Sequence, residues 1–439
     1  MALKRRCDAV RPEQTQPTGD GRSCKSQAKP FEISKQEVFE AYKRVKSNKG
    51  GEGSDGQSLE DFDADLKNNL YKIWNRLSSG SYMPPPVLRV EISKSDGGIR
   101  QLGIPTVGDR IAQMVVKQRM EPEMERIFHP DSYGYRRGKS ALDAVAVTRE
   151  RCWHRPWVLD MDIKGFFDAI DHDLLMLAVE KHVPEKWMRL YIERWLKTPV
   201  QHRDGRLETR DVGTPQGGVI SPVLANLFLH YVFDIWIEKH WHGIQFARYA
   251  DDIVCHCVSE REALRLKDVL NERFEACGLT LHPGKTKIVY CKSSNNKQDY
   301  PRVSFDFLGH TFKPRLIKSR KGVFFVGFTP AISGRAAKAI REKIRNWKIF
   351  RNSRTDLSAV ANYKRSTLTG WINYFGRYGR AELMRTMIYL DQVVVRWARR
   401  KYKRLKRKRK AVRWFTGVRL REPNLFVHWR FANETMAGR

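Results

Sequence analysis

The sequence predicts an α+β protein in which a region of mixed helices and strands is followed by a region made of helices alone. Short runs rich in β-branched and aromatic residues, bounded by turn residues, occur between residues 87 and 257. After about residue 330, apolar residues recur only at helical spacing. The 439 residues also exceed what one hydrophobic core usually organises, so two or three domains are expected.

The first ordered element is predicted near residue 34. Residues 1–33 mix Arg, Pro, Gly, Gln and Ser without apolar periodicity, which predicts a disordered basic arm. Ser34 and Glu37 then have the spacing of a capping box, and apolar residues follow at helical spacing. A helix is therefore expected to start directly after Ser34.

Three strand segments and one further helix follow from local patterns. Residues 87–104 predict a β-hairpin, because two β-rich runs flank an Asp-Gly turn. Residues 158–163 (VLDMDI) and 246–257 (FARYADDIVCHC) predict strands that carry acids, and a buried carboxylate is costly unless it has a partner. Between them, Ser221-Pro222 predicts a helix with Ser as its N-cap and Pro in its first turn.

The charge of the chain indicates a phosphate-rich partner. Lys and Arg number 82 against 49 Asp and Glu, a formal net charge of +33, so nucleic acid is the expected partner. Eleven of the fifteen residues 396–410 are Lys or Arg, and we expect this run to contact phosphates. No apolar run of 18 residues occurs, so we expect no membrane association and a cytoplasmic, nucleoid-associated location in a bacterium.

The seven cysteines give no sign of a metal site. They are scattered, and none forms a C-x-x-C pair or a Cys/His group with zinc spacing. Cys255 and Cys257 fall on one face of a predicted strand, where buried small hydrophobes are a simpler interpretation than metal binding. Reduced thiols are expected.

Asp162 in one acid-bearing strand and Asp251-Asp252 in the other are the candidates for catalytic chemistry. In-line nucleotide transfer uses two magnesium ions, which prefer oxygen ligands such as carboxylates brought together from neighbouring strand ends. Taken alone, two adjacent acids at a strand turn are more often plain hairpin residues. Other motifs must therefore support this interpretation.

Such motifs occur in a fixed order along the chain. Their series resembles the numbered sequence blocks of reverse transcriptases, most closely those of group II intron-encoded proteins, and covers roughly residues 34–430. The blocks are the basic hairpin at 94–100, SYGYRRGKSALDAV (132–145), the Asp162 strand, GTPQGGVISPVLANLF (213–228), YADD, GLTLHPGKTKIV (278–289) and FDFLGHTF (305–312). Agreement of seven blocks in one order is highly specific.

The resemblance implies a right-hand polymerase fold, in which fingers and an antiparallel palm sheet precede an α-helical thumb. The GWINYFGRYGRAELM segment carries the likeness to the thumb, or maturase domain, of these proteins. The expected divisions are a disordered arm at 1–33, fingers at 34–155, palm at 156–328, thumb or maturase domain at 329–395 and a basic nucleic-acid-binding segment at 396–439.

Carried over residue by residue, Asp162 matches the family's first metal-binding aspartate, and Asp251 and Asp252 match its YxDD pair. Asp160 is the rival for the first role. Asp162 is preferred because Phe167 follows five residues later, where the family places the side chain that excludes a ribose 2′-hydroxyl. The expected ligands of two Mg²⁺ ions, or of Mn²⁺ in their place, are Asp162, Ile163, Asp251 and Asp252.

The resemblance also implies a site for the incoming nucleotide. Lys94 and Arg100 resemble the fingers residues that clamp the triphosphate, and Gln216 belongs to the loop behind the nucleotide. Lys285 matches a family lysine that donates a proton to pyrophosphate, with an ordinary turn lysine as the equal alternative. For Phe167, the simpler alternative is an aromatic residue that packs in the core. For Lys94 and Arg100, it is that they are ordinary solvated charges of a hairpin. The expected nucleotide-binding residues are Lys94, Arg100, Phe167, Gln216, Gly217 and Lys285.

The helical region is expected to bind RNA. Trp371 and Phe375, at helical spacing, are expected to pack in its core. The tail has no H-N-H-type cluster of His and Cys, so no metal-dependent endonuclease domain is expected. The expected RNA contacts are Tyr378, Arg380, Arg399, Arg400, Lys401, Lys403 and Arg404.

The resemblance thus implies an RNA-directed DNA polymerase that copies its parent group II intron RNA and, as a maturase, promotes splicing and mobility. Its partners would be the intron RNA, an RNA template with a DNA primer, dNTPs and target DNA. The oligomeric state is open, a dimer being one option. Two alternatives are a free-standing host reverse transcriptase used in defence or repair, and an RNA-binding splicing factor whose polymerase site is relict.

Overall fold

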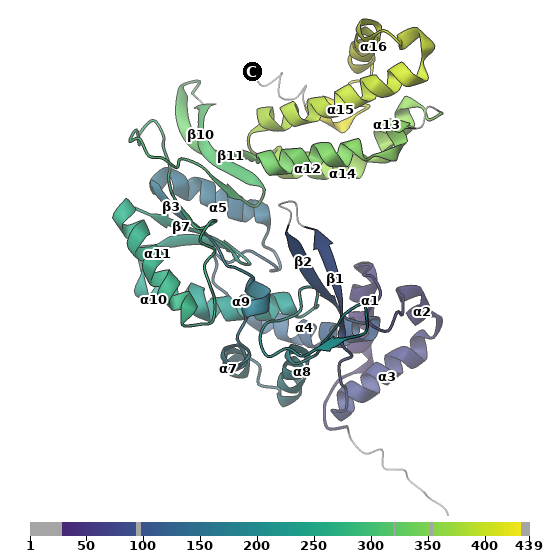
Figure 1. Cartoon of the computed structure of the whole chain (residues 1–439), viewed down its shortest axis with the longest axis vertical. Helices are drawn as coiled ribbons and strands as arrows, with labels where there is room; N and C mark the ends of the chain where they lie inside the picture. Colours follow the sequence, from purple (N-terminus) through teal and green to yellow (C-terminus); the bar gives the residue numbers. More distant parts are fainter. Residues whose placement is uncertain (1–28, 94–97, 320, 352–353, 432–439) are drawn as a thin grey trace, which may run out of the picture.

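The computed structural model describes residues 29–93, 98–319, 321–351 and 354–431. A mixed region of helices and sheets leads into a helical region (residues 334–431), which lies at one end of the molecule in Figure 1. The helices of the mixed region are α1 (Lys35–Ser47), α2 (Leu59–Ala64), α3 (Leu66–Ser79), α4 (Val107–Ile127), α5 (Ala141–His154), α6 (Phe166–Ala169), α7 (His172–His182), α8 (Lys186–Leu196), α9 (Ser221–Leu229), α10 (Ile235–His240) and α11 (Glu260–Glu275).

The central sheet is antiparallel and has the strand order β6-β7-β3-β8. Its strands are β3 (Trp157–Asp162), β6 (Gln245–Tyr249), β7 (Asp252–Cys257) and β8 (Lys287–Tyr290). Because side chains alternate between the faces of a strand, Leu159 and Met161 enter the larger core with α11, whereas Val158 enters a second core with α5. The two helices therefore cover opposite faces of the sheet.

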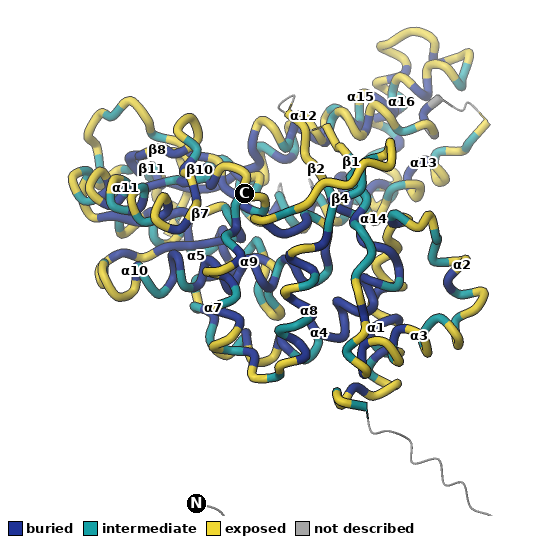
Figure 2. Tube along the Cα trace, turned by 60° about the horizontal axis from the view of Figure 1, so that its bottom comes forward, coloured by how far each residue is buried: buried dark blue, intermediate teal, exposed yellow. Residues whose placement is uncertain are grey.

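A second sheet contains the hairpin that the sequence predicts, in the order β2-β1-β4-β5. In it β1 (Val87–Ser93) pairs antiparallel with β2 (Ile99–Ile104), and β4 (Val200–Gln201) joins β1 in parallel and pairs with β5 (Leu207–Glu208). The hairpin is exposed toward its turn, whereas α4 and α9 are largely buried (Figure 2). The hairpin thus projects from a firmly packed base.

The third sheet connects the central sheet to the helical region. Its order is β11-β10-β9, with β9 (Phe305–Phe307), β10 (His310–Lys318) and β11 (Phe324–Ile332). Phe305 stacks on Phe312 and Phe328, and all three belong to the α5 core that contains Val158. The third sheet therefore packs on the same face of the central sheet as α5.

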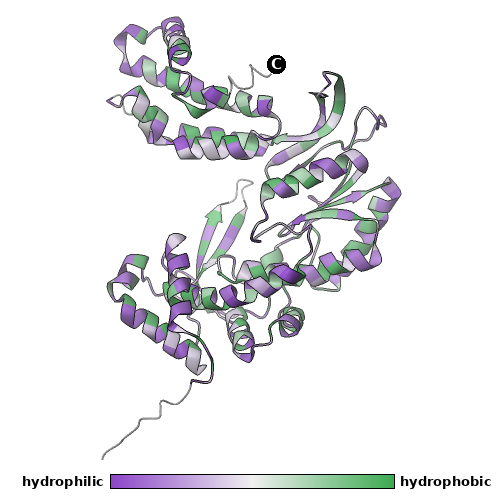
Figure 3. Ribbon diagram, turned by 180° about the vertical axis from the view of Figure 1, so that it is seen from behind, coloured by the Kyte–Doolittle hydropathy of each residue, from purple (hydrophilic) through white to green (hydrophobic). Residues whose placement is uncertain are grey.

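The helical region has one core that runs from Ile332 to Phe431. Helices of this region carry hydrophobic and hydrophilic residues in alternation along their length (Figure 3), as expected for helices with one buried side. Its elements are α12 (Gly334–Arg345), the 3-10 helix η2 (Lys348–Arg351), α13 (Leu357–Tyr363), α14 (Arg365–Phe375), α15 (Arg380–Lys401), the 3-10 helix η3 (Lys403–Leu405) and α16 (Lys408–Arg421).

The expected division at residue 396 falls inside helix α15. Trp397 and Leu405, which lie within the basic run, are buried in the same core as Phe415 of α16. The expected division at residue 329 likewise falls inside strand β11. The basic run is therefore one face of the helical region rather than a separate segment.

The start of the ordered chain differs from the sequence prediction. The capping box of α1 is confirmed, since Ser34 and Glu37 exchange side-chain to backbone hydrogen bonds. However, Phe31 packs against Trp187 and Ile33 is buried, so order begins before Ser34. Phe31 thus anchors the chain on α8, and the Ile33 carbonyl accepts a hydrogen bond from Trp74 of α3 at 2.7 Å. The rest of the predicted arm, residues 1–28, lies outside the described residues.

Helix α9 also differs at its start. Ile220, not Ser221, is the N-cap, and the prediction of a Ser cap was wrong. The Ser221 hydroxyl instead accepts a hydrogen bond from Thr214 Oγ1 at 2.8 Å, which ties the helix to the loop before it. The helix continues through a π-helical turn (His230–Asp234) into α10.

Cys255 and Cys257 are both buried in the core on the α11 side of β7, which confirms their interpretation as small hydrophobes.

In the part of the chain that the structure describes, no helix has the length and apolar character needed to cross a bilayer.

Candidate active site

The strand register brings the acidic residues of the two predicted strands together. Asp162, the last residue of β3, lies directly opposite Asp252, the first residue of β7. Residues opposite each other in an antiparallel pair have Cβ atoms about 5 Å apart. Because Tyr249 pairs with Asp252, Ala250 and Asp251 form a two-residue turn at the same end of the sheet.

The turn itself is held in an unusual conformation. Ala250 has a φ of +57°, a left-handed conformation that costs a non-glycine residue roughly 1–2 kcal/mol. A Cβ on Gly134 would lie 2.5 Å from the Ala250 backbone nitrogen, so only glycine allows this close approach. The packing of the 132–145 block against the turn therefore fixes where Asp251 projects.

Asp160 occupies a different environment from Asp162, although both lie on one face of β3. It pairs with Val254 and Lys287, one step further into the sheet. Burial raises the pKa of Asp160 to about 8, with the nearby carboxylate of Asp252 adding to the effect. A carboxyl that is largely protonated at neutral pH is a poor ligand for a hard cation. Of the two carboxyl groups, Asp162 is therefore the better candidate ligand for a divalent cation.

The remaining acids of the site carry more negative charge than their surroundings neutralise. Burial, together with the nearby carboxylates of Asp251 and Asp162, raises the pKa of Asp252 to about 7. Burial also raises the pKa of Asp251, and again Asp162 contributes. A bound divalent cation would remove this repulsion, so the donor set fits a hard metal ion.

One cation of the protein already reaches this site. Lys285 Nζ donates to Asp162 Oδ2 at 2.8 Å, from the turn that precedes β8. Over the described ranges no three His, Cys, Asp or Glu side chains are arranged as a finished metal site. The Lys285 ammonium thus occupies one oxygen of the Asp162 carboxylate.

Ile163 adds a main-chain oxygen next to Asp162. Its side chain is buried, and it forms an isolated bridge with Leu281. The hydrogen bonds of that bridge are made by neighbouring groups, with Lys164 N–H donating to Thr280 O and His282 N–H donating to Asp162 O. The Ile163 carbonyl is therefore not used by the bridge.

A cavity of about 760 Å³ opens beside the carboxylates and gathers most of the predicted nucleotide-binding residues. Asp252 adjoins this cavity without lining it, and Lys94 lies outside the described residues. The predicted residues that line the cavity are Arg100, Asp162, Ile163, Phe167, Gln216, Gly217, Asp251 and Lys285.

The 213–218 loop forms one wall of the cavity because its glycines permit close packing. Gly217 has a φ of +125°, and a Cβ there would lie 2.7 Å from the Gly103 carbonyl oxygen. Gly103 N–H donates to Gln216 O at 2.9 Å, which joins the loop to the hairpin strand β2. Gln113 Oε1 accepts from Val219 N–H at 2.7 Å and anchors the far end of the loop.

Phe167 lies next to this loop, on the short helix α6, and its carbonyl accepts a hydrogen bond from Thr214 N–H at 2.7 Å. Its ring packs edge-on against Phe166 at 5.3 Å, and Phe166 is buried in the core. Phe167 itself is half-buried and lines the cavity. The side chain is therefore positioned by the core and forms part of the cavity wall, and its role toward a nucleotide stays a prediction.

Sequence reasoning missed Tyr135, which also lines the cavity. It has a φ of +58°, is half exposed and packs near Tyr249 of the YADD turn, with ring centroids 6.3 Å apart. The signal available was its place in the SYGYRR block. His282, which belongs to the GLTLHPGKTKIV block, and Lys164, which directly follows the Asp162 strand, line the cavity too and were not predicted as site residues.

The predicted RNA-binding residues lie in the helical region and differ in their exposure and in their contacts. Tyr378 is half-buried, and its ring faces the guanidinium of Arg149 at 5.5 Å. Arg380 is exposed above the Phe431 ring at 4.8 Å. Lys401 donates to Thr355 O, whereas Lys403 and Arg404 are exposed. Trp371 stacks on Trp347 as a packing residue.

Two family models match the chain. Residues 92–312 match the model described as reverse transcriptase (RNA-dependent DNA polymerase). Residues 337–415 match the model described as the group II intron maturase-specific domain. The first match contains the whole cavity described above, and the second lies within the helical region.

Relatives and solved structures are also similar to the chain. Protein YkfC of Escherichia coli (strain K12) is 32% identical over 327 residues, which cover 64% of this chain and 81% of YkfC. The group II intron-encoded protein LtrA of Lactococcus lactis subsp. cremoris is 34% identical over 280 residues, 62% of this chain but only 46% of LtrA. Telomerase from Candida albicans, solved with a TWJ fragment of telomeric RNA, aligns at 12% identity with a TM-score of 0.46, covering 85% of this chain and 68% of that chain.

Proposed function

Because this chain belongs to the reverse transcriptase family and carries a group II intron maturase-specific domain, we propose that it copies its parent intron RNA into DNA and, as a maturase, promotes splicing and mobility of that RNA. The observation that carries the proposal is the placement of Asp162 opposite Asp252, with Asp251 in the adjoining turn and a nucleotide-sized cavity beside them. Polymerase chemistry requires such a carboxylate cluster.

The three aspartates hold the cations in this proposal, and the Ile163 carbonyl supplies a further oxygen. Two bound Mg²⁺ ions, with Mn²⁺ as a substitute, would stabilise charge on the attacking and leaving oxygens. The protein keeps the carboxylates ready for this role at the end of a packed sheet. In that arrangement, Asp160 stays out of the cation site, because burial keeps it largely protonated.

The cavity walls position the incoming nucleotide. Arg100 binds the triphosphate, since a guanidinium can donate two parallel hydrogen bonds to phosphate oxygens. Phe167 packs against the sugar and leaves no room for a 2′-hydroxyl. The backbone at Gln216 and Gly217 approaches the nascent base pair, which the absence of a Cβ on Gly217 permits.

Lys285 holds a proton next to the reacting phosphates. Its ammonium lies 2.8 Å from Asp162 and is half exposed to the cavity side. A cation held by Asp162 would compete with this ammonium for the carboxylate and would leave the ammonium free to face the triphosphate. From there Lys285 Nζ can donate its proton to the departing pyrophosphate.

The sequence divisions correspond in this proposal to fingers, palm and a thumb that also serves as the maturase domain. The net charge of +33 provides the surface for an RNA template with its DNA primer, for the parent intron RNA and for target DNA. The maturase activity belongs to the helical region, where the second family model matches.

Primer extension tests the polymerase half of the proposal. The wild-type protein should extend a DNA primer on an RNA template in the presence of Mg²⁺ and dNTPs. Asp251→Ala should abolish extension and leave RNA binding unchanged, whereas Asp268→Ala, an exposed acid on α11, should behave like wild type. A wild-type protein that binds RNA without any extension would favour the splicing factor with a relict site.

A splicing reaction run in parallel tests the maturase half. If the DNA flanking the reading frame encodes a folded ribozyme, the protein should accelerate splicing of that transcript, and Asp251→Ala should still do so. An active polymerase without any effect on splicing, or without ribozyme sequences around its gene, would instead indicate a free-standing host reverse transcriptase.

A further inference from the structure

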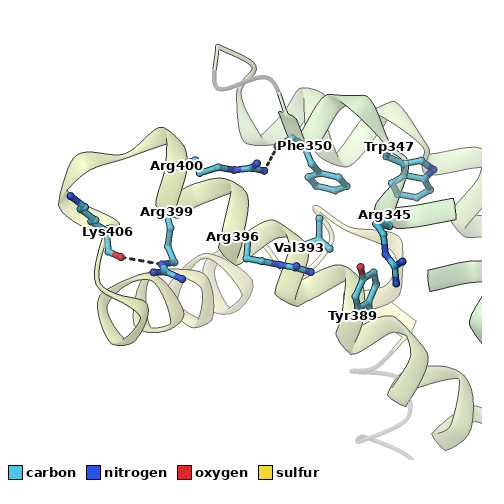
Figure 4. Close-up of a pocket in the computed structure, with 9 residues that line it drawn as sticks. All are labelled: Arg345, Trp347, Phe350, Tyr389, Val393, Arg396, Arg399, Arg400 and Lys406. Atoms are coloured by element: carbon cyan, nitrogen blue, oxygen red, sulfur yellow. Dashed lines mark hydrogen bonds between the residues drawn. The ribbon is translucent and has the colours of Figure 1, made fainter. Parts of the chain in front are cut away.

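A second cavity, of about 430 Å³, lies in the helical region, away from the carboxylates. It is bounded by the end of α12, by η2 and by one face of α15 (Figure 4). On α15, Tyr389, Val393, Arg396 and Arg400 recur at intervals of four, three and four residues, so they share one side of the helix. Its volume falls in the range of small-ligand sites, roughly 300–1,000 Å³.

One end of this cavity is aromatic. Trp347 stacks nearly parallel on Trp371 and on Phe350, with centroids 5.9 and 6.1 Å apart. Phe350 is buried, while Trp347 and Tyr389 are half-buried and face the cavity. The rings are therefore held in place by the core while one surface of the group is available to a flat ligand.

The other end is cationic, as Figure 4 shows for Arg399, Arg400 and Lys406. Arg399 donates from Nε to Lys406 O at 3.0 Å, and Arg400 donates to Phe350 O, so backbone carbonyls orient both guanidinium groups. Arg396 lies between the two ends, over the Tyr389 ring at 5.5 Å. No Asp or Glu is among the described residues that line the cavity.

Both acidic residues of α15 are engaged elsewhere, and Glu382 pairs with Arg315 of β10. Asp391 Oδ1 accepts hydrogen bonds from His428 Nε2 at 2.7 Å and from Trp429 Nε1 at 2.9 Å. The positive field is also apparent at Tyr389, whose pKa is lowered mainly by its hydrogen bond with Arg345. The cavity thus joins a stacking surface to a set of Arg and Lys side chains with no acid among the described lining residues.

We propose that this cavity binds a single unpaired nucleotide of RNA, its base against Trp347, Phe350 and Tyr389 and its phosphates on Arg396, Arg399 and Lys406. Aromatic rings next to arginines suit bases that have left a helix, whereas a duplex presents only its backbone and shallow groove. The inference rests on the proposed function, because it assumes that the helical region binds RNA. It adds a specific element to that binding, namely the capture of one bulged residue.

Two RNA hairpins that differ at one position test the proposal on the full chain. One carries a single bulged adenosine and the other an abasic residue at the same place, so their phosphates are alike. Fluorescence anisotropy should show that wild type binds the adenosine hairpin about tenfold more tightly, a typical effect of stacking one base. Equal affinity for the two hairpins would overturn the proposal.

Variants assign the preference to the cavity. Tyr389→Leu should reduce the tenfold preference to about onefold, whereas Tyr389→Phe, which keeps the ring, should retain it. Arg396→Gln with Arg399→Gln should weaken binding of both hairpins and reduce the preference. The matched pair Lys403→Gln with Arg404→Gln removes the same charge from exposed residues outside the cavity and should leave the preference intact. Equal loss of preference in both double variants would show that diffuse charge accounts for the binding.

A cross-linking measurement avoids dependence on variants that fold poorly. A hairpin with bulged 4-thiouridine, irradiated with the wild-type protein, should cross-link to peptides that contain Trp347 or Tyr389. Cross-links confined to residues 92–312 would overturn the proposal. Primer extension on a short unstructured template should be unchanged in Tyr389→Leu, so a failure of this proposal is distinguishable from a failure of the polymerase proposal.

Discussion

Gly217 shows how a single residue without a side chain shapes the cavity beside the carboxylates. Its φ of +125° is strained for any other residue, and a Cβ would lie 2.7 Å from the Gly103 carbonyl oxygen. We predict that Gly217→Ala lowers kcat/KM for dNTPs by tenfold or more, since strain of roughly 1–3 kcal/mol displaces the loop. Gly51→Ala, where a Cβ meets open space, is the matched control in steady-state primer extension. Equal kcat/KM for both variants would contradict this role.

Phe167 should set the choice of sugar. Replacement by Ala removes the ring from the cavity wall, so we predict that ribonucleotide incorporation relative to deoxynucleotide rises on the order of 10²-fold. Paired kcat/KM measurements for dNTP and rNTP check this. If Phe167→Ala kept the wild-type ratio, the ring would be a packing residue only.

His256 should make stability depend on pH. It is fully buried on β7, and burial lowers its pKa from 6.5 to about 3. The unfolded chain binds a proton below pH 6.5 that the folded chain does not, so stability is complete above pH 6.5 and is lost as the pH falls toward 3. Between pH 7 and pH 5, protonation of the unfolded chain at this residue should lower the free energy of unfolding by about 2 kcal/mol.

Urea unfolding at pH 5, 6 and 7 tests this effect. His256→Leu, which cannot be protonated, should flatten the acid side of the stability profile. His242→Leu, at an exposed position, should leave the profile as in wild type. An unchanged profile in His256→Leu would mean that other groups govern the acid loss.

At the residue scale, the sequence predicted the side chains that carry a distinctive motif. Asp162 and the YADD pair could be found because each interrupts an apolar strand. Tyr135 belongs to the SYGYRR block, but its place in the cavity was not predicted, since it depends on a left-handed backbone and on a contact with Tyr249 from a distant segment. The role of Ser221 was also missed, because only the folded loop brings Thr214 to its hydroxyl.

The joint between α9, α10 and β6 depends on one buried ion pair. Arg248 donates to both carboxylate oxygens of Asp234 at 2.7 and 2.5 Å, and neither side chain is exposed. Burial acts to raise the pKa of Asp234, but Arg248 and His230 outweigh it and the pKa is lowered. Arg248 also donates to Asn226 Oδ1 at 2.9 Å, which positions β6 just before the YADD turn.

Breaking the Asp234–Arg248 ion pair should strongly destabilise the folded protein. Asp234→Asn leaves a buried guanidinium without its carboxylate, so we predict a loss of about 3–5 kcal/mol in the free energy of unfolding. Glu193→Gln, which breaks an exposed i,i+4 pair with Lys197, should cost only about 0.3–0.5 kcal/mol. Urea unfolding of the two variants measures the contrast, and similar losses would show that the buried pair adds little.

At the element scale, local patterns predicted α1 and the β1–β2 hairpin, because capping boxes and Asp-Gly turns act over a few residues. The π-helical turn at His230–Asp234 was not predictable from such patterns. It is accompanied by the Asp234–Arg248 contact, which joins residues 14 positions apart and exists only in the folded chain.

Across the whole molecule, the net charge of +33 should provide much of the affinity for RNA. The exposed part of the basic run should release counterions when it binds phosphates. We predict that replacing Arg407, Lys408, Arg409 and Lys410 by Gln weakens RNA binding and reduces the slope of log K against log salt by about 0.7 for each phosphate that the protein no longer neutralises. A salt titration by anisotropy measures this slope, and an unchanged slope would place these residues outside the interface.

The α+β class and the helical C-terminal region were predictable because hydrophobic periodicity extends over many residues. It was not predictable that residues 396–431 share one core with the rest of the helical region. Its Lys and Arg residues obscure the apolar pattern of Trp397, Leu405 and Phe415, which are buried. Long basic side chains on one face conceal a helix that is anchored by the other face.

The central claim is that Asp162, Asp251 and Asp252 together hold the divalent cations for nucleotide transfer. The most direct test is anomalous diffraction from crystals of the protein with primer, template and a non-hydrolysable dNTP, grown in Mn²⁺. We predict manganese peaks between the Asp162 and Asp251 carboxylates, with Lys285 released from Asp162. Manganese absent from this position, or bound elsewhere while Lys285 still pairs with Asp162, would contradict the account.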